Sequence, residues 1–288
     1  MNQVEKVKFK LSEEEHNRIY KQIEQKVFHG AKKSEKPIAI IVGGQSGSGK
    51  GAVISYSKRQ VESAGGNIII ITTDEYKPFH PRAIELAKEY PTDYVEIIEQ
   101  DAGSWTGQVL KKAIDEKYSF IFEGTLKNER ILERIRELKQ NGFRVVVRAL
   151  AVPRLESLLS IHERYQKQMD TLGFGRLVSV DYHNSAYEGV PKTIDAIEKS
   201  GLCKVEIYKR GKIITEPILI YSSDSNERRF ANARMALIEG RKSEERKTYL
   251  TAPARIEELL SQYGRRNATI SEFEELDKIE DYLEELTK

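Results

Sequence analysis

"IAIIVGGQSGSGKG", residues 38–51, joins an apolar run to a glycine-rich turn, and the segment that follows it has helical character. Gly44 to Lys50 meet the pattern Gly-x-x-x-x-Gly-Lys of a phosphate-binding loop. In such a loop, backbone N–H groups at the positive end of the following helix surround a β-phosphate, and the lysine bridges the β and γ oxygens. A glycine-rich turn without a ligand is the alternative interpretation. The expected ATP-binding residues are Gly44, Gln45, Ser46, Gly47, Ser48, Gly49, Lys50 and Gly51.

The position after the lysine departs from this pattern. Gly51 stands where a serine or threonine normally supplies a hydroxyl to Mg²⁺. Because Mg²⁺ keeps several water ligands in proteins, phosphates, water and an acidic side chain can still hold it. We therefore expect weaker metal binding with nucleotide binding retained, and no direct metal ligand at Gly51.

Apolar runs and helix-length segments alternate along the chain after this loop. Continuous Ile/Val runs of this kind are typical of a parallel sheet that is buried on both faces. The sequence therefore predicts an α/β fold with a mostly parallel central sheet flanked by helices. The further candidate strands are residues 67–73, 119–124, 143–152, 204–210 and 217–223.

The composition argues against several classes of protein. Lysine plus arginine (47) nearly balance aspartate plus glutamate (45), and this net charge of +2 argues against a dedicated nucleic-acid binder. The single cysteine, Cys203, rules out an internal disulfide or a cysteine metal cluster. No apolar targeting segment opens the chain, and no apolar run approaches membrane-spanning length. We expect a cytoplasmic protein without a nucleic-acid partner or membrane contact.

Asp74, in "TTDEYKPFHP" (72–81), ends the second apolar run. A carboxylate at a strand tip can hold magnesium, as in ATPases. Asp74, however, lies on the strand directly after the P-loop helix, next to the acceptor side of the site. There it is suited to take a proton from a substrate hydroxyl that attacks the γ-phosphorus. Because the guanine-recognition signal Asn-Lys-x-Asp is missing from the sequence, the pattern favours a kinase over a GTPase.

This interpretation divides the chain into three parts. An N-terminal helix and linker cover residues 1–36, a P-loop kinase core covers 37–224, and a charged helical C-terminal extension covers 225–288. Within the core, "DTLGFGR" is punctuated by glycine and fits the hinge of a lid near 164–184.

Four motifs, in this order and spacing, resemble the zeta toxins of bacterial toxin–antitoxin systems: "GGQSGSGK", "TTDEYKPFHP", "FIFEGTLKN" and "HERYQKQ". The similarity covers roughly residues 37–210. It implies a P-loop kinase that uses ATP and Mg²⁺ to phosphorylate the 3′-hydroxyl of UDP-N-acetylglucosamine or a related sugar nucleotide, and so inhibits cell-wall synthesis. It also implies a small helical antitoxin that covers the ATP site.

The resemblance also implies roles for individual residues. Lys50 matches the P-loop lysine, and Asp74 matches the general base that orients the sugar hydroxyl. Arg164, in "ERY", and Arg176, in "GFGR", match two arginines that close over the transferring phosphoryl group. Arginines suit this role because the transfer spreads negative charge over three oxygens. The catalytic set is thus Lys50, Asp74, Arg164 and Arg176, and the substrate-binding set is Asp74, His80, Glu123 and Thr125, with Glu123 also the candidate that supports the metal.

One of these assignments competes with a simpler one, and one further position departs from the pattern of the family. His80, followed by Pro81, can merely shape the turn after the acidic residue. Gly107 falls where these toxins usually carry a glutamate that contacts the sugar nucleotide, and Glu99 or Asp101 can substitute for it.

Two other functions stay open from the sequence. One is a kinase that acts on another small hydroxylated molecule, such as a nucleoside or an antibiotic, which the glycine at position 107 motivates. The other is a nucleotide-binding interaction protein with little turnover, which the glycine at position 51 motivates. His162 and His183 lack a second ligand at metal spacing, so we assign them no metal role.

Overall fold

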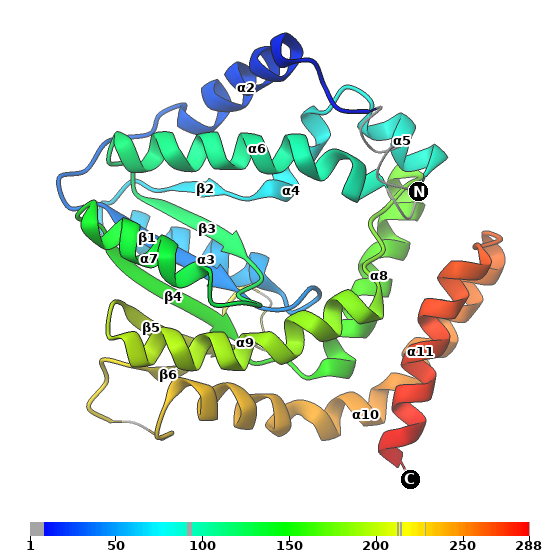
Figure 1. Cartoon of the computed structure of the whole chain (residues 1–288). Helices are drawn as coiled ribbons and strands as arrows, with labels where there is room; N and C mark the ends of the chain where they lie inside the picture. The colour runs from blue at the N-terminus through cyan, green and yellow to red at the C-terminus, as the bar shows by residue number, and fades with distance from the viewer. Residues whose placement is uncertain (1–8, 91–93, 212, 214, 228, 288) are drawn as a thin grey trace.

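The computed structural model describes residues 9–90, 94–211, 213, 215–227 and 229–287. Among these residues, six strands form one sheet in the order β2-β3-β1-β4-β5-β6 (Figure 1). Every neighbouring pair is parallel except β5 and β6, which are antiparallel. The predicted α/β fold with a mostly parallel sheet is confirmed. The strands are β1 (Ile38–Gly43), β2 (Ile69–Ile71), β3 (Phe120–Gly124), β4 (Arg144–Leu150), β5 (Lys204–Lys209) and β6 (Ile218–Ser222).

Helices flank this sheet and connect its parallel strands. Their bounds are α2 (Glu13–Phe28), α3 (Lys50–Ser63), α4 (Thr73–Tyr76), the 3₁₀ helix η1 (Lys77–Phe79), α5 (Ala83–Glu89), α6 (Tyr94–Asp115), α7 (Ile131–Gln140), α8 (Arg154–Leu172), α9 (Val180–Ser200), α10 (Ala233–Arg265) and α11 (Ile270–Thr287). Figure 1 shows α2 and α6 beside β2 at one end of the sheet and α10 beside β6 at the other, and the same elements are in contact.

The strands form because their sequences are nearly continuous apolar runs. Ala39, Ile40, Ile41 and Val42 of β1 are all buried, so both faces of the sheet are covered. On one face, α3 packs against Ile40 and Val42, and on the other the main core gathers residues of α2, α6, α7, α9 and α10. The interior of the sheet therefore positions its edges rigidly.

The strand register brings three strand ends to the same edge of the sheet. Gly43, the last residue of β1, is paired with Gly124 at the end of β3 and with Ala149 near the end of β4. In open α/β sheets, ligands bind beyond the carboxyl ends of the strands. The loops that follow β1, β3 and β4 are therefore the ones that can build a common site.

The C-terminal helices are packed into the fold. Ala233, Ala236 and Leu237 of α10, which lie in the segment predicted as a helical C-terminal extension, belong to the main core. A second apolar cluster joins α8 to the second half of α10 and to α11, for example through Tyr263 and Ile279. Helix α10 thus packs against the main core, and α10 and α11 together pack against α8.

Within the part of the chain that the structure describes, no helix is both long and apolar enough to cross a membrane.

Candidate phosphoryl-transfer site

The glycine-rich turn connects β1 to α3 and ends at Gly49, directly before the first helical residue Lys50. Gly49 has a φ of 90°, and Gly47 has a φ of 73°, a conformation that glycine adopts without strain. A Cβ at Gly47 would lie 2.0 Å from the carbonyl oxygen of Ser157, so the turn also packs too closely for a side chain there. The backbone N–H groups at the start of α3 face this turn, which makes it an anion site.

Gln45 supports the turn from behind. Its side chain is fully buried, and its Nε2 donates to the Val152 carbonyl at 3.1 Å and to Ser157 Oγ at 3.3 Å. Arg241 Nη2, from α10, donates to Gln45 Oε1 at 3.4 Å. The Gln45 side chain therefore points into the protein, and only its backbone is available to a nucleotide.

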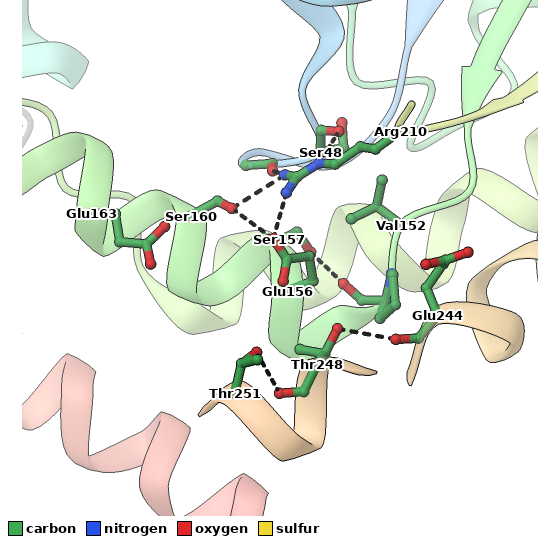
Figure 2. A network of polar contacts seen from close by, with 12 residues as sticks. Ser48, Val152, Glu156, Ser157, Ser160, Glu163, Arg210, Glu244, Thr248 and Thr251 are labelled. Carbon is green, nitrogen blue, oxygen red and sulfur yellow. Dashed lines mark hydrogen bonds and ion pairs between the residues drawn. The ribbon is translucent and has the colours of Figure 1, made fainter. Parts of the chain in front are cut away.

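Arg210, at the end of β5, is a residue that sequence reasoning missed. Its guanidinium donates to the carbonyls of Gly47 and Ser48 in the turn and pairs with Glu156 of α8 (Figure 2). It also donates to Ser160 Oγ at 3.2 Å. The only signal in the sequence is a basic residue at the end of an apolar run, which is too common to identify a P-loop contact.

Lys50 reaches across the turn toward a carboxylate. Its Nζ donates to the carbonyls of Gly44 and Gln45, each at 3.2 Å, and lies 3.6 Å from Glu123 Oε1. Burial lowers the pKa of the Lys50 ammonium, and the Glu123 carboxylate opposes that shift. The lysine is thus held against the carbonyls of the turn, beside the Glu123 carboxylate.

Glu123 is near the end of β3, and Thr125 follows that strand directly. Glu123 Oε2 accepts a hydrogen bond from Thr72 Oγ1 at 3.1 Å. Carboxylate oxygens are ligands that Mg²⁺ prefers. No group of three or more His, Cys, Asp or Glu side chains arranged for a metal exists among the described residues, so Glu123 is suited to hold Mg²⁺ only together with phosphates and water.

Asp74 lies in the first turn of α4, directly after β2. Arg176 Nη1 donates to both of its carboxylate oxygens, at 2.7 and 2.9 Å, and Lys77 Nζ donates to Oδ1 at 2.7 Å. Burial raises the pKa of Asp74, but the charges of Arg176 and Lys77 outweigh burial, and the net shift is downward. Lys77, which the sequence did not single out, is itself buried and also pairs with Glu99 at 2.9 Å.

The two arginines lie on the segments that were expected to form a lid. Arg164 is on α8, and Arg176 is in the loop between α8 and α9. Arg164 is exposed to solvent as a whole residue, but burial of its guanidinium among surrounding atoms lowers its pKa, and the nearby charge of Arg176 lowers it further. The charges of Arg164, Arg176, Asp74 and Glu123 all act on the Lys50 ammonium. Two ion pairs, Lys50 with Glu123 and Arg176 with Asp74, thus lie near enough to each other and to Arg164 for their charges to act on one another, and these five side chains are called the cluster below.

Several expected residues lie outside this cluster. His80 is only 2% exposed, its Nδ1 accepts from the backbone N–H of Arg82, and its Nε2 lies 3.9 Å from Asp101. The assignment of His80 as a substrate contact therefore does not fit its position, and it belongs to the packing around the turn. Gly107 is exposed on α6, and a Cβ there would have no neighbour within 4 Å. Of the two proposed substitutes, Asp101 is buried beside His80, whereas Glu99 reaches the cluster through Lys77.

Comparison with known proteins identifies this arrangement. A family model described as Zeta toxin matches residues 22–224, which is more than half of the chain. The chain belongs to the zeta toxin family. The predicted resemblance is confirmed, and the matched span extends it on both sides.

Curated relatives agree with this membership. The zeta toxin chain is 30% identical over 210 residues to "Toxin zeta" of Enterococcus hirae, covering 72% of this chain and 70% of the relative. It is 28% identical over 235 residues to "Toxin PezT" of Streptococcus pneumoniae serotype 4, covering 80% of this chain and 90% of the relative.

Solved structures place the zeta toxin chain in the P-loop kinase fold. A structure from the PezAT chromosomal toxin–antitoxin system of Streptococcus pneumoniae matches with a TM-score of 0.73 and 25% identity, covering 87% of this chain and 98% of that one. An AvrRxo1-ORF1:AvrRxo1-ORF2 structure with ATP matches with a TM-score of 0.52 and 14% identity, covering 73% of this chain and 66% of that one, and this similarity concerns the fold alone. The kinase fold supports a phosphotransferase in general.

Removing the guanidinium at position 176 should raise the pKa of Asp74. In Arg176→Ala, the charge that lowers this pKa most is lost, while burial, which raises it, remains. In the unchanged chain the depressed pKa keeps Asp74 ionised at neutral pH, and the stability gained from the pair is lost as the pH falls through that pKa. NMR titration of the aspartate carboxyl carbons measures the shift.

The matched control for this titration is Arg134→Ala, which removes an exposed guanidinium paired with Glu137 on α7. It should leave the pKa of Asp74 unchanged. If both variants leave that pKa unchanged, the Arg176–Asp74 contact does not exist in solution.

Proposed function

We propose that this zeta toxin is an ATP-dependent kinase that transfers the γ-phosphoryl group to a hydroxyl of a sugar nucleotide, specifically the 3′-hydroxyl of UDP-N-acetylglucosamine, and thereby inhibits cell-wall synthesis. The observation that carries the proposal is the cluster of Lys50, Arg164, Arg176, Asp74 and Glu123 beside the P-loop. Phosphoryl transfer needs little covalent chemistry from the protein and depends on positioning and charge. This cluster offers both at one place.

The triphosphate would lie in the turn between β1 and α3, and a neighbouring cavity suits the nucleoside. This cavity has a volume of about 420 Å³ and is lined in part by Arg210 and Glu156, the ion pair beside the P-loop (Figure 2). Its lining combines apolar, hydroxyl and charged groups, as expected for a base and a ribose. The cavity is lined, among other residues, by Val152, Glu156, Arg210, Thr248 and Thr251.

Asp74 would orient the acceptor hydroxyl and accept its proton. Both oxygens of the carboxylate accept hydrogen bonds from Arg176, so the hydroxyl has to share or replace that contact. Once released from Asp74, the guanidinium can turn toward the transferring phosphoryl oxygens, together with Arg164 and Lys50. The same contact therefore links hydroxyl binding to charge stabilisation on the phosphoryl group.

Magnesium would be held by Glu123, phosphate oxygens and water, because the glycine at position 51 supplies no oxygen ligand. A bound Mg²⁺ would neutralise charge on the β- and γ-phosphates. Glu123 suits this role because its carboxylate lies beside Lys50 at the carboxyl end of β3. Its hydrogen bond from Thr72 fixes the orientation of the carboxylate.

An antitoxin partner and a cytoplasmic location complete the proposal. The PezAT structure comes from a toxin–antitoxin system, and the AvrRxo1-ORF1 chain was solved in complex with AvrRxo1-ORF2. We propose that a small helical antitoxin blocks the ATP site of this chain in the same compartment where ATP and sugar nucleotides are made.

Asp74→Asn should abolish sugar phosphorylation and leave nucleotide binding intact. The amide keeps the shape of the side chain but loses the base, so kcat should fall by roughly 10²–10⁴. Mass spectrometry of UDP-N-acetylglucosamine after incubation with MgATP measures the product, and a fluorescent ADP analogue measures binding. Asp277→Asn, on the distant α11, is the control and should keep full activity. If unaltered protein yields no phosphorylated product across a panel of sugar nucleotides, nucleosides and aminoglycosides, the kinase proposal fails.

Gly51→Thr should strengthen Mg²⁺ use. A Cβ at Gly51 meets no atom within 4 Å, so the larger side chain fits, and its hydroxyl restores a metal ligand. One polar contact contributes about 1 kcal/mol, so the Mg²⁺ concentration that gives half-maximal rate should fall by roughly five-fold. Gly51→Ala is the matched control because it adds the Cβ and helix propensity without a hydroxyl. Equal Mg²⁺ dependence in the two variants would contradict the assignment.

Thr251→Trp should weaken ATP binding by filling the cavity beside the P-loop. We expect KM for ATP to rise by about ten-fold, which corresponds to about 1.4 kcal/mol, while KM for the sugar nucleotide stays constant. Leu250→Trp is the control, because Leu250 is the next residue on α10, is 77% exposed and does not line the cavity. If the two variants have the same KM for ATP, the nucleoside binds elsewhere.

A further inference from the structure

The residues on both sides of Arg164 contact the C-terminal helices. Arg164 lies in the middle of α8, and its neighbours at positions 162, 163, 165 and 166 each contact α10, α11 or the turn between them. These contacts were not expected from the sequence, which treated the segment after residue 225 as an extension. They form one after another along a single turn of the helix.

His162 makes the most deeply buried of these contacts. Its Nδ1 lies 2.9 Å from the hydroxyl of Tyr263 on α10, and both side chains are at most 1% exposed. Burial lowers the pKa of His162 to about 4, so the ring is neutral at physiological pH and makes a hydrogen bond that does not depend on a nearby charge. The two rings are also stacked, with centroids 6.1 Å apart.

Glu163 is held by a two-point ion pair. Arg255 of α10 donates from Nε and Nη2 to the two carboxylate oxygens, at 2.6 and 2.8 Å. Arg255 Nη1 also donates to Glu156, two turns earlier on α8, at 2.6 Å. Two parallel hydrogen bonds fix the geometry of both partners more strongly than a single contact.

Tyr165 and Gln166 are fastened to the turn between α10 and α11. Arg266 Nε donates to Gln166 Oε1 at 2.8 Å, and the Arg266 guanidinium pairs with Glu272 of α11. Burial and the nearby Glu272 carboxylate raise the pKa of the Tyr165 hydroxyl. The guanidinium lies over the rings of Tyr165 and Tyr263, at 5.4 and 4.6 Å from their centroids.

Helical geometry explains why Arg164, unlike the residues at positions 162, 163, 165 and 166, points away from the C-terminal helices. Residues two apart on an α-helix point about 200° away from each other, since each residue turns by about 100°. The anchored residues at 162 and 166 therefore point away from the direction of Arg164. Arg164 is exposed, and it lies near enough to Arg176, Asp74 and Glu123 for their charges to act on its pKa.

We propose that the α10–α11 helix pair is the positioning device for Arg164, and that Tyr263, Arg255 and Arg266 are positioning residues for phosphoryl transfer. This inference rests on the proposed kinase function. A guanidinium on a flexible side chain stabilises transferring charge only when its helix is fixed, and a displacement of about 1 Å can cost roughly 100-fold in rate. The contacts of residues 162, 163, 165 and 166 with α10, α11 and the turn between them supply that fixation.

The test is a double-mutant cycle between the anchors and Arg164. The paired variant Tyr263→Phe/Arg266→Gln removes one hydroxyl and one guanidinium without changing a residue of the cluster. It should lower kcat for UDP-N-acetylglucosamine phosphorylation by at least ten-fold and leave KM for ATP within two-fold. In an Arg164→Ala background the same pair should lower kcat by less than two-fold, because the group that it positions is gone. An equal fall of kcat in both backgrounds would overturn the proposal.

A control and a second readout separate this proposal from the kinase proposal. Arg265→Gln removes an exposed pair with Glu258 on α10 and should leave kcat unchanged in both backgrounds. Hydrogen–deuterium exchange across residues 160–170 needs no turnover, and it should become at least five-fold faster in the paired variant. If unaltered protein makes no product, the kinase proposal fails, and unchanged exchange of this segment would then overturn the anchoring as well.

Discussion

Lys50, Arg164 and Arg176 lie close enough for their positive charges to act on one another, and this repulsion is the constraint on which the site depends. Burial lowers the pKa values of Lys50 and Arg164, and the neighbouring positive charges lower them further. Asp74 and Glu123 compensate part of this charge. Positive charges gathered in this way suit the binding of an anion between them, and the neighbouring glycine-rich turn has the sequence pattern of a phosphate-binding loop.

The scaffold holds this unfavourable cluster in place through contacts that lie behind it. The parallel register of β1, β3 and β4 fixes where the P-loop and Glu123 begin, and the apolar core makes that register rigid. Arg210 and Gln45 then fix the backbone of the P-loop from two sides. On the lid side, α10 and α11 hold α8.

The sequence predicted the parts of the site that local patterns encode. An apolar run followed by Gly-x-x-x-x-Gly-Lys identifies both a strand and its loop, and Asp74 could be placed because it ends the next apolar run. His80, for which the sequence left both a substrate contact and a role in the turn open, is buried, and its Nε2 lies 3.9 Å from Asp101, a surrounding that no local pattern reveals. Arg210, Lys77 and the anchors of α8 were missed because their partners lie far away in the chain, where no local pattern can reveal them.

The central claim is that these charges meet on a single phosphoryl group. A crystal structure of the chain with ADP, aluminium fluoride, Mg²⁺ and UDP-N-acetylglucosamine tests it most directly, because aluminium fluoride imitates the transferring group. The account predicts that Lys50, Arg164 and Arg176 each lie about 3 Å from the fluoride or bridging oxygen atoms, with Asp74 at hydrogen-bond distance from the sugar 3′-hydroxyl. A complex in which Arg176 still covers Asp74 while Arg164 points into solvent would contradict it.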